Sequence, residues 1–129
     1  DQKHQDKVVE KAVGFLVQDE QERVLLTCMV SCLFAREVYK REVLAECLGS
    51  LGYKTLAGDL EAVSNSVQKL RWKIRVATGF NPSAAEIPKR FTEVTTWKGK
   101  VDGDYLKALK SDYARRIMEM GREERDDRS

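Results

Sequence analysis

The three cysteines of this 129-residue chain, Cys28, Cys32 and Cys47, come closest to a chemical site by their type and spacing. Cys28 and Cys32 are four residues apart, so a continuous helix would place both thiols on one face. A complete metal site needs about four ligands, and Cys47 is the only further thiol. Because cysteine most often packs as a small apolar residue, spacing alone predicts that the Cys28 and Cys32 pair belongs to the core. An odd number of cysteines argues against a secreted disulfide framework, and we therefore expect a cytoplasmic protein.

Other common catalytic and binding motifs are missing from the sequence. The single histidine, His4, lies in the polar N-terminal stretch, which nearly excludes a Ser-His-Asp arrangement. Glycine-rich phosphate loops of the G-x-x-x-x-G-K-[ST] or G-x-G-x-x-G type are absent. The formal net charge is only +2, and the basic residues of one predicted helix spread around its polar side, as on a solvated surface. We therefore expect no nucleic-acid partner. These basic residues are Lys69, Arg71, Lys73 and Arg75.

The composition indicates one helix-rich domain. Hydrophobic residues make up 42% of the chain and charged residues 34%, against about 25% charged in ordinary domains, which suits amphipathic helices. The longest apolar run, residues 24–35, is shorter than the roughly twenty residues of a membrane span, so we expect core and no membrane partner. The polar ends predict a frayed terminus over residues 1–7 and a charged, disordered tail over residues 119–129, with a single helical domain at 8–118.

Apolar spacing predicts an all-α fold, a compact bundle of about five helices. We expect a first helix with an apolar stripe from Val8 to Leu16, and further helices over residues 24–35, 39–50 and 59–76. A last helix follows the capping sequence at 102–104. In the helix at 39–50, Cys47 lies on the predicted apolar side. The clearest stripe, with steps of three and four residues, is formed by Leu60, Val63, Val67, Leu70 and Ile74.

A proline-containing connector interrupts the helical pattern. Both prolines of the chain, Pro82 and Pro88, lie between the long fourth helix and the last one. Gly79 tolerates a positive φ and predicts the end of the long helix, while each proline fixes φ in the connector. We expect Arg90 to reach inward or to cap a helix end, and Phe91 to anchor the turn in the core.

Three stretches occur in an order and spacing that resemble one enzyme family. LRWKIRVATGF and EIPKRF, residues 70–80 and 86–91, share Gly-Phe and Pro-x-Arg-Phe with a pattern N-x-R-E-G-F followed by L-P-x-R-F. SCLFA around Cys32 is similar to a C-x-F segment, and residues 105–116 are similar to a closing helix that ends in Y-Y-x-x-R-G-W. Over about residues 8–116, the chain resembles the C-terminal helical domain of the aldehyde ferredoxin oxidoreductase family.

The resemblance implies a function that the chain serves only within a longer protein. Members of the family hold tungsten or molybdenum between two pterins, oxidise aldehydes to carboxylic acids and pass electrons through a 4Fe–4S cluster to ferredoxin. The resemblance implies that Cys32 is the last cluster ligand, the remaining ligands lying outside this chain. Expected partners are ferredoxin and the remaining domains. The chain, which does not begin with methionine, is expected to be inactive alone, with no catalytic residue and no bound cofactor of its own.

The sequence departs from the family pattern at several positions. Where the family has D-x-x-G-L-C, this chain has Thr27, Val30 and Ser31 before Cys32, and the aspartate it lacks helps to hold a pterin. These changes predict a divergent branch, with a different substrate or a partly degenerate site. The other departures are Arg75, Ala77 and Thr78 for the N-x-R-E residues, and Ile117 and Met118 for the final Gly-Trp.

Two interpretations from other classes stay open. The chain can be a helical interaction or structural domain that has kept the fold without a redox function, with Cys32 as a core residue. A basic nucleic-acid module is the weaker alternative, and it requires salt-sensitive binding to an oligonucleotide.

Overall fold

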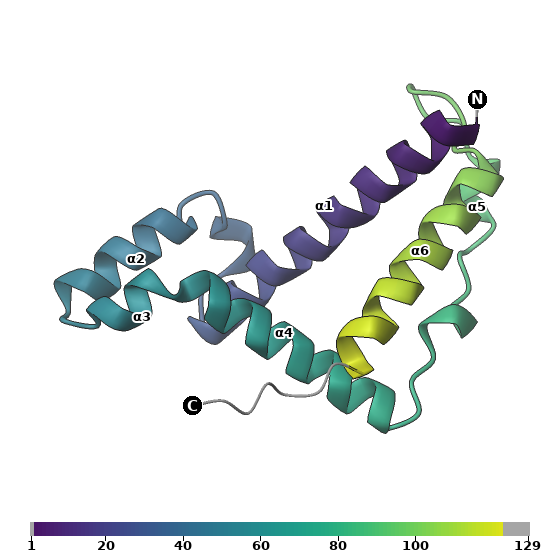
Figure 1. Ribbon diagram of the computed structural model, residues 1–129. Coiled ribbons are helices and arrows are strands. Elements are labelled where there is room, and N and C mark those ends of the chain that lie inside the picture. Colours follow the sequence, from purple (N-terminus) through teal and green to yellow (C-terminus); the bar gives the residue numbers. More distant parts are fainter. Residues whose placement is uncertain (1, 123–129) are drawn as a thin grey trace. The chain divides into compact units, whose positions relative to one another are not determined.

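The computed structural model describes residues 2–122, and the side chains of residues 5–122 (Figure 1). It confirms the all-α fold class: residues 2–122 are 74% helical, and this described part of the chain has six α-helices, four of them with seven or more residues. In chain order, the α-helices and the two short 3-10 helices are α1 (Gln2–Cys28), η1 (Leu33–Ala35), α2 (Arg41–Ser50), α3 (Lys54–Gly58), α4 (Leu60–Ala77), η2 (Pro82–Ala84), α5 (Arg90–Glu93) and α6 (Gly103–Arg122).

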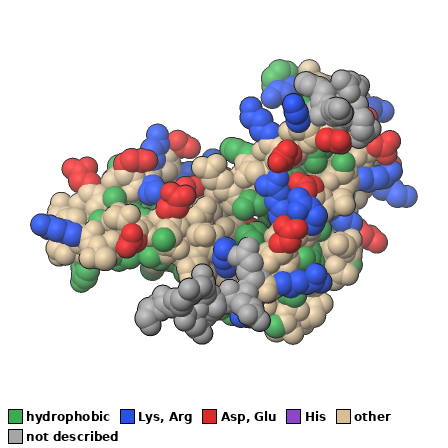
Figure 2. Space-filling view, viewed as in Figure 1, with side chains coloured by type: hydrophobic (Ala, Val, Ile, Leu, Met, Phe, Trp, Pro, Cys, Tyr) green, Lys and Arg blue, Asp and Glu red, His purple; other side chains and the backbone are tan. Residues whose placement is uncertain are grey.

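The helices form two compact units, which are described separately. Unit 1 combines Asp1–Val17 with Trp72–Ser129, and unit 2 is Gln18–Arg71. Apolar side chains are visible on the surfaces of both units (Figure 2). Between residues 2 and 122, no helix combines the length and the apolar character that crossing a membrane requires.

The core of unit 2 joins the end of α1 to α2 and to the start of α4. Leu25 and Leu26 pack with Leu44, Leu48 and Leu60, and all five side chains are buried. Each fully buried leucine contributes about 1.5–3 kcal/mol to folding. This cluster fixes the two ends of the segment that connects α1 to α2. Met29, Ala45 and Ala57 pack against it from the edge.

The core of unit 1 is built from the first half of α1, the end of α4 and α6. Val9 and Val13 of α1, Trp72 of α4 and Ile117 of α6 are buried. Helices α4 and α6 approach closely at Gly121, where an added Cβ would lie 2.8 Å from a Cγ of Val76. A residue with a Cβ at this position would force the Val76 side chain or one of the two helices to move.

The predicted ends of several helices hold in the structure. The helix expected over residues 59–76 is α4, and the one expected over 39–50 is α2, which begins two residues later. The predicted cap of the last helix is confirmed, because the Tyr105 N–H donates to Asp102 Oδ1 at 2.7 Å. Helix α1 already begins at Gln2, and α6 runs to Arg122, whereas the rest of the predicted tail, residues 123–129, lies outside the described residues.

The helix expected over residues 24–35 is wrong. Helix α1 ends at Cys28, and the chain then turns away from its axis. The Ser31 N–H donates to the Leu26 carbonyl at 2.9 Å, and the Val30 N–H donates to the Thr27 carbonyl at 3.1 Å. With Val30 at φ +54°, these are the two hydrogen bonds of a Schellman C-cap. The apolar run therefore divides into a buried helical half and an exposed half.

The predicted apolar stripe of α4 is only partly buried. Leu60 is buried, but Leu70 and Ile74 are exposed, while the polar Ser64 and Gln68 are buried instead. Both polar side chains have partners, because Ser64 Oγ donates to the Glu61 carbonyl and Gln68 Nε2 donates to Glu20 Oε2, each at 3.0 Å. The buried face therefore follows steps of four residues through Ser64 and Gln68, made possible by these hydrogen bonds.

The connector after α4 begins as the sequence predicts. Gly79 has φ +88°, and the Phe80 N–H donates to the Arg75 carbonyl at 2.9 Å, which is again a Schellman cap. Pro82 is buried and opens η2. The prediction that Phe91 anchors in the core is wrong, because its side chain is 56% exposed. Arg90 is also exposed and starts α5, a helix of four residues that is too short to bury a face.

Candidate functional site

The three cysteines are all exposed, so the core prediction for Cys28 and Cys32 is wrong. Cys32 lies after the end of α1 in an extended conformation, with φ −69° and ψ 126°, and is followed by η1. The two thiols therefore do not share one helical face. Cys47 is on the outer side of α2, because Leu44 and Leu48 occupy the buried side.

The turn between α1 and Cys32 contains a conformation that valine adopts rarely. Val30, at φ +54°, is the only residue other than glycine with a positive φ among residues 2–122. For a β-branched residue, this left-handed conformation costs about 1–2 kcal/mol. A glycine here would adopt it without that cost. Position 30 is also the position of the glycine in the D-x-x-G-L-C pattern.

The segment around Cys32 is apolar and exposed. We call residues 29–40 the Cys32 loop. Val30 is 94% exposed and Phe34 is 92% exposed, and Val38 and Tyr39 are exposed to a lesser degree. A loop that presents several apolar side chains to solvent is typical of an interaction surface. The loop therefore offers a thiol together with apolar contacts on either side of it in sequence.

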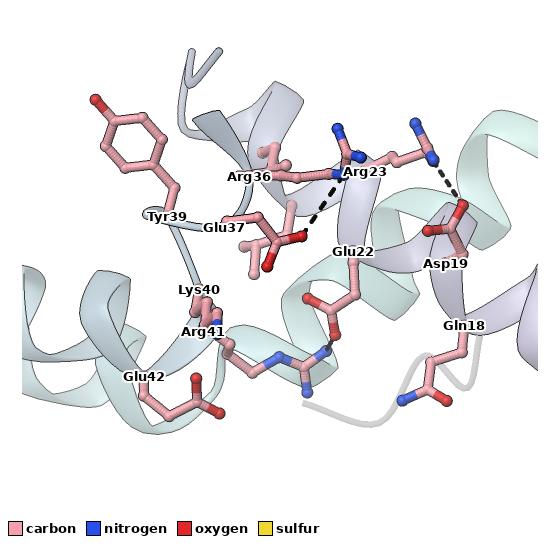
Figure 3. A pocket seen from close by; sticks show the side chains of 12 residues that line it. Gln18, Asp19, Glu22, Arg23, Arg36, Glu37, Tyr39, Lys40, Arg41 and Glu42 are labelled. Carbon is pink, nitrogen blue, oxygen red and sulfur yellow. Dashed lines mark hydrogen bonds and ion pairs between the residues drawn. The ribbon is translucent and has the colours of Figure 1, made fainter. Parts of the chain in front are cut away.

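A cavity of about 460 Å³ lies where the Cys32 loop enters α2, between residues 18–26 of α1 and residues 36–42 (Figure 3). Arg41 points across it and forms ion pairs with Glu22 and, at 2.9 Å, with Glu61 Oε2. Beside them, Arg23 Nε lies 2.6 Å from Asp19 Oδ2. The lining residues include no histidine or cysteine. Arg23 and Arg41 are both paired with carboxylates.

Arg41 therefore acts as a clamp in unit 2. Its guanidinium holds the first residue of α2 to carboxylates on α1 and α4, and its side chain is only 24% exposed. The clamp fixes the C-terminal end of the Cys32 loop, while the Schellman cap at Val30 fixes the other end. The direction in which Cys32 leaves α1 is thus set at both ends of the loop.

A metal site built from this chain alone is not present in the described part of the structure. Between residues 2 and 122, no group of three or more His, Cys, Asp or Glu side chains could hold a metal ion. Cys32 is exposed and has an extended backbone, so its thiol is reachable from outside the chain. Thr27, at the position of the pattern's aspartate, donates its hydroxyl to the Arg23 carbonyl at 2.9 Å.

Two features of unit 1 could not be found from sequence spacing. The Arg75 guanidinium, predicted as part of a solvated surface, lies 5.0 Å from the ring centroid of Trp72 and 6.0 Å from that of Phe80. It therefore makes cation–π contacts at the end of α4. The second feature is Trp97, which is 90% exposed. In the sequence, the exposure of Trp97 is indicated only by its polar neighbours at residues 95, 96, 98 and 100.

Comparison of the chain with protein-family models, with curated proteins and with solved structures gave no match. The functional interpretation therefore depends on the residues and on their geometry.

Proposed function

We propose that this chain is the C-terminal helical domain of a tungsten- or molybdenum-pterin, iron–sulfur oxidoreductase that oxidises aldehydes to carboxylic acids, with ferredoxin as electron acceptor. In this proposal Cys32 supplies one ligand to a 4Fe–4S cluster, and the other ligands lie outside the chain. The observation that carries it is the exposure of Cys32 in an extended loop, next to the exposed side chains of Val30 and Phe34. A ligand for a shared cluster has to be presented in this way.

The two Schellman caps support the same proposal. The aligned motifs place a glycine at position 30 and at position 79, each at the end of a helix. In the structure, both positions have a positive φ, +54° at Val30 and +88° at Gly79. A positive φ is the physical reason for a glycine at such a site. These two positive φ values support the proposal, because glycine is the residue that the motifs have at both positions.

The residues of this chain have a positioning role in the proposed enzyme. A bound 4Fe–4S cluster supplies one-electron transfer, and the polypeptide sets its ligands and its surroundings. Arg41 and the Val30 turn hold the two ends of the Cys32 loop. Val30 and Phe34, two residues before and two residues after Cys32 in the sequence, are exposed and would help to exclude water from a cluster once a neighbouring domain covered the loop.

Iron and acid-labile sulfide analysis of the full-length protein, purified without oxygen, tests the proposal. The variants are Cys32→Ser and the matched controls Cys28→Ser and Cys47→Ser, which change the two other exposed cysteines. We expect Cys32→Ser to lose most of the cluster and its electron paramagnetic resonance signal. Both controls should keep the wild-type content, since neither is a proposed ligand. Unchanged iron and sulfide in Cys32→Ser would refute the ligand assignment.

The alternative is a helical interaction domain without a redox role, and the exposed apolar side chains of the Cys32 loop favour it as well. The same preparation separates the two. A full-length protein that binds neither iron nor tungsten or molybdenum under anaerobic purification, yet folds normally, would leave the interaction domain as the better interpretation.

A further inference from the structure

The loop between α5 and α6 contains a rigid turn that presents Trp97 to solvent. Thr96 and Gly99 exchange two backbone hydrogen bonds, of 3.0 and 2.9 Å. The Thr96 hydroxyl donates to the Gly99 carbonyl at 2.9 Å and accepts from the Lys98 N–H at 3.2 Å. Gly99 has φ +97°, which completes the turn. Figure 1 shows this loop at the end of unit 1 where α6 begins.

The turn belongs to a longer segment that is exposed almost throughout. We call residues 87–101 the Trp97 segment, and every residue in it except Thr92 is exposed. Five of these residues are large and apolar, and Trp97, at 90%, is the most exposed of them. Exposed apolar side chains that gather in one stretch are typical of an interaction surface. The five are Ile87, Phe91, Val94, Trp97 and Val101.

The Trp97 segment also carries the excess positive charge of the chain. It contains four basic residues and one acidic residue, Glu93, which gives a net charge of +3. The chain as a whole has +2, so the remaining residues together have a net charge of −1. The acidic residues that flank the segment are Glu86 and Asp102, and Asp102 accepts a hydrogen bond at the N-terminus of α6. Lys and Arg side chains gather at this end of unit 1 (Figure 2).

The four basic side chains of the segment are free to meet an anionic partner. All four are exposed, and none forms an ion pair with another side chain of residues 5–122. The partner that complements the segment therefore combines negative charge with apolar surface. The four basic residues are Lys89, Arg90, Lys98 and Lys100.

A bilayer of anionic phospholipids has both properties. Tryptophan favours the boundary between headgroups and acyl chains, where its ring is buried and its N–H stays near water. The Lys98 ammonium lies 4.8 Å from the indole centroid, so a cation accompanies the ring to the depth of the headgroup phosphates. The aliphatic side chains of Ile87, Val94 and Val101 gain from burial among acyl chains.

A single-stranded nucleic acid fits the Trp97 segment less well. Its bases would stack on Trp97 and Phe91, and its phosphates would bind the basic side chains. It offers no comparable surface to the aliphatic side chains, because bases stack on aromatic rings. The composition of the segment therefore favours lipid over nucleic acid.

We propose that the Trp97 segment is a membrane-surface anchor, with Trp97 inserted at the boundary of an anionic bilayer and the four basic side chains on its headgroup phosphates. Apolar insertion and a basic patch are the two signals that a peripheral anchor combines. The length of the apolar runs, from which we expected no membrane partner, concerns only segments that cross a bilayer. This inference is independent of the proposed redox function.

Sedimentation with lipid vesicles tests the proposal on the full-length protein and on the 129-residue chain, with a reducing agent present because the cysteines are exposed. The vesicles contain either equal parts of phosphatidylserine and phosphatidylcholine or phosphatidylcholine alone. We expect binding to the anionic vesicles only, and weaker binding as salt is raised. Trp97→Ala should weaken the binding at least about tenfold, and Lys98→Gln and Lys100→Gln about fivefold each.

Tryptophan fluorescence of the 129-residue chain shows whether the turn itself enters the bilayer. Trp72, the other tryptophan, is only 6% exposed, so quenching by phosphatidylcholine brominated on its acyl chains reports on Trp97. In vesicles of phosphatidylserine and this brominated lipid, we expect quenching of the wild-type chain and almost none of Trp97→Ala. Bound chain without any quenching would overturn the insertion of Trp97.

Three control variants separate this contact from others. Phe15→Ala removes an aromatic side chain that is 67% exposed on α1, and Lys73→Gln removes the charge of an exposed lysine of α4. Phe34→Ala removes the most exposed aromatic side chain of the Cys32 loop. None of the three should change the binding to vesicles. Circular dichroism checks that each variant stays folded.

Several results would overturn the proposal. A full-length protein that does not bind the anionic vesicles excludes it, and binding by the 129-residue chain alone would show that another domain covers the segment. Equal binding to both kinds of vesicle excludes recognition of anionic lipid. Binding that depends on Phe34 and not on Trp97 assigns the contact to the Cys32 loop. A chain that binds a single-stranded oligonucleotide through Trp97, and no vesicle, assigns the segment to nucleic acid instead.

Discussion

Replacing Val30 with glycine should stabilise the protein, although the change removes an apolar side chain. Val30 has φ +54° at the C-cap of α1, a conformation that costs a β-branched residue about 1–2 kcal/mol. Glycine removes that cost but loses about 0.5–1 kcal/mol through the greater freedom of its unfolded chain. Because the Val30 side chain is 94% exposed, the substitution sacrifices almost no burial. The expected net gain is about 0.5–1 kcal/mol, or about 2–5 °C in the melting temperature.

Urea unfolding at equilibrium, analysed with the slope of the wild type, measures this difference. The matched control is Val38→Gly, the same substitution in the same loop at a residue without a positive φ and with a 63% exposed side chain. It should destabilise by at least about 0.5–1 kcal/mol, since glycine gives the unfolded chain more freedom and the partly covered valine side chain is removed. Opposite signs at positions 30 and 38 isolate the backbone term. A Val30→Gly variant less stable than the wild type would refute the Schellman cap at Val30.

Two further predictions concern the cores and the clamp. Gly121→Ala should destabilise by about 1–3 kcal/mol, because its Cβ would lie 2.8 Å from a valine side chain of α4. Gly49→Ala in α2, where a Cβ meets nothing within 4 Å, should stabilise by about 0.5–1 kcal/mol. Thermal unfolding of Gly121→Ala and Gly49→Ala shows whether the space around the new Cβ decides between destabilisation and stabilisation. Arg41→Met should cost about 1–2 kcal/mol in urea unfolding, because it leaves two clamped carboxylates without their partly buried cation. Arg115→Met, whose ion pairs are on the surface of α6, should leave the unfolding midpoint unchanged, and equal losses in the two arginine variants would contradict the clamp.

The bounds of a helix with a regular apolar period could be predicted from the sequence. Which face of that helix is buried could not. Helix α4 lies within one residue of its predicted bounds because its apolar side chains repeat every three or four residues. The same repeat also predicted burial of Leu70 and Ile74, which are exposed. Period alone does not distinguish neighbouring faces of a helix. The buried polar positions are satisfied by hydrogen bonds: Ser64 bonds locally to the Glu61 carbonyl, whereas Gln68 depends on Glu20, which is 48 residues away in the sequence.

The end of α1 is a case in which residue type gives a false signal. Residues 24–35 are apolar enough to continue a helix, and valine is not a residue that marks a C-cap. The burial of Leu25 and Leu26 against α2 and α4, together with the two capping hydrogen bonds, offsets the local cost of the turn at Val30. The same packing exposes Cys32, which residue statistics assign to the core. Cys32 could be selected as a site residue through family resemblance, but its presentation to solvent required the structure.

The strain at Val30 bears on the proposed function because the residue lies two positions before Cys32. A glycine at position 30 would form the same turn without this conformational cost. The valine in this chain therefore lowers the stability of the folded Cys32 loop relative to a glycine at the same position. Ligation of Cys32 in the full-length protein would stabilise only the conformation in which the turn is formed, and would therefore offset part of that cost. It follows that Val30→Gly should raise stability most in protein without a cluster. If the gain were the same with and without iron, the Val30 turn and Cys32 would be energetically independent, and the turn would be a feature of the fold alone.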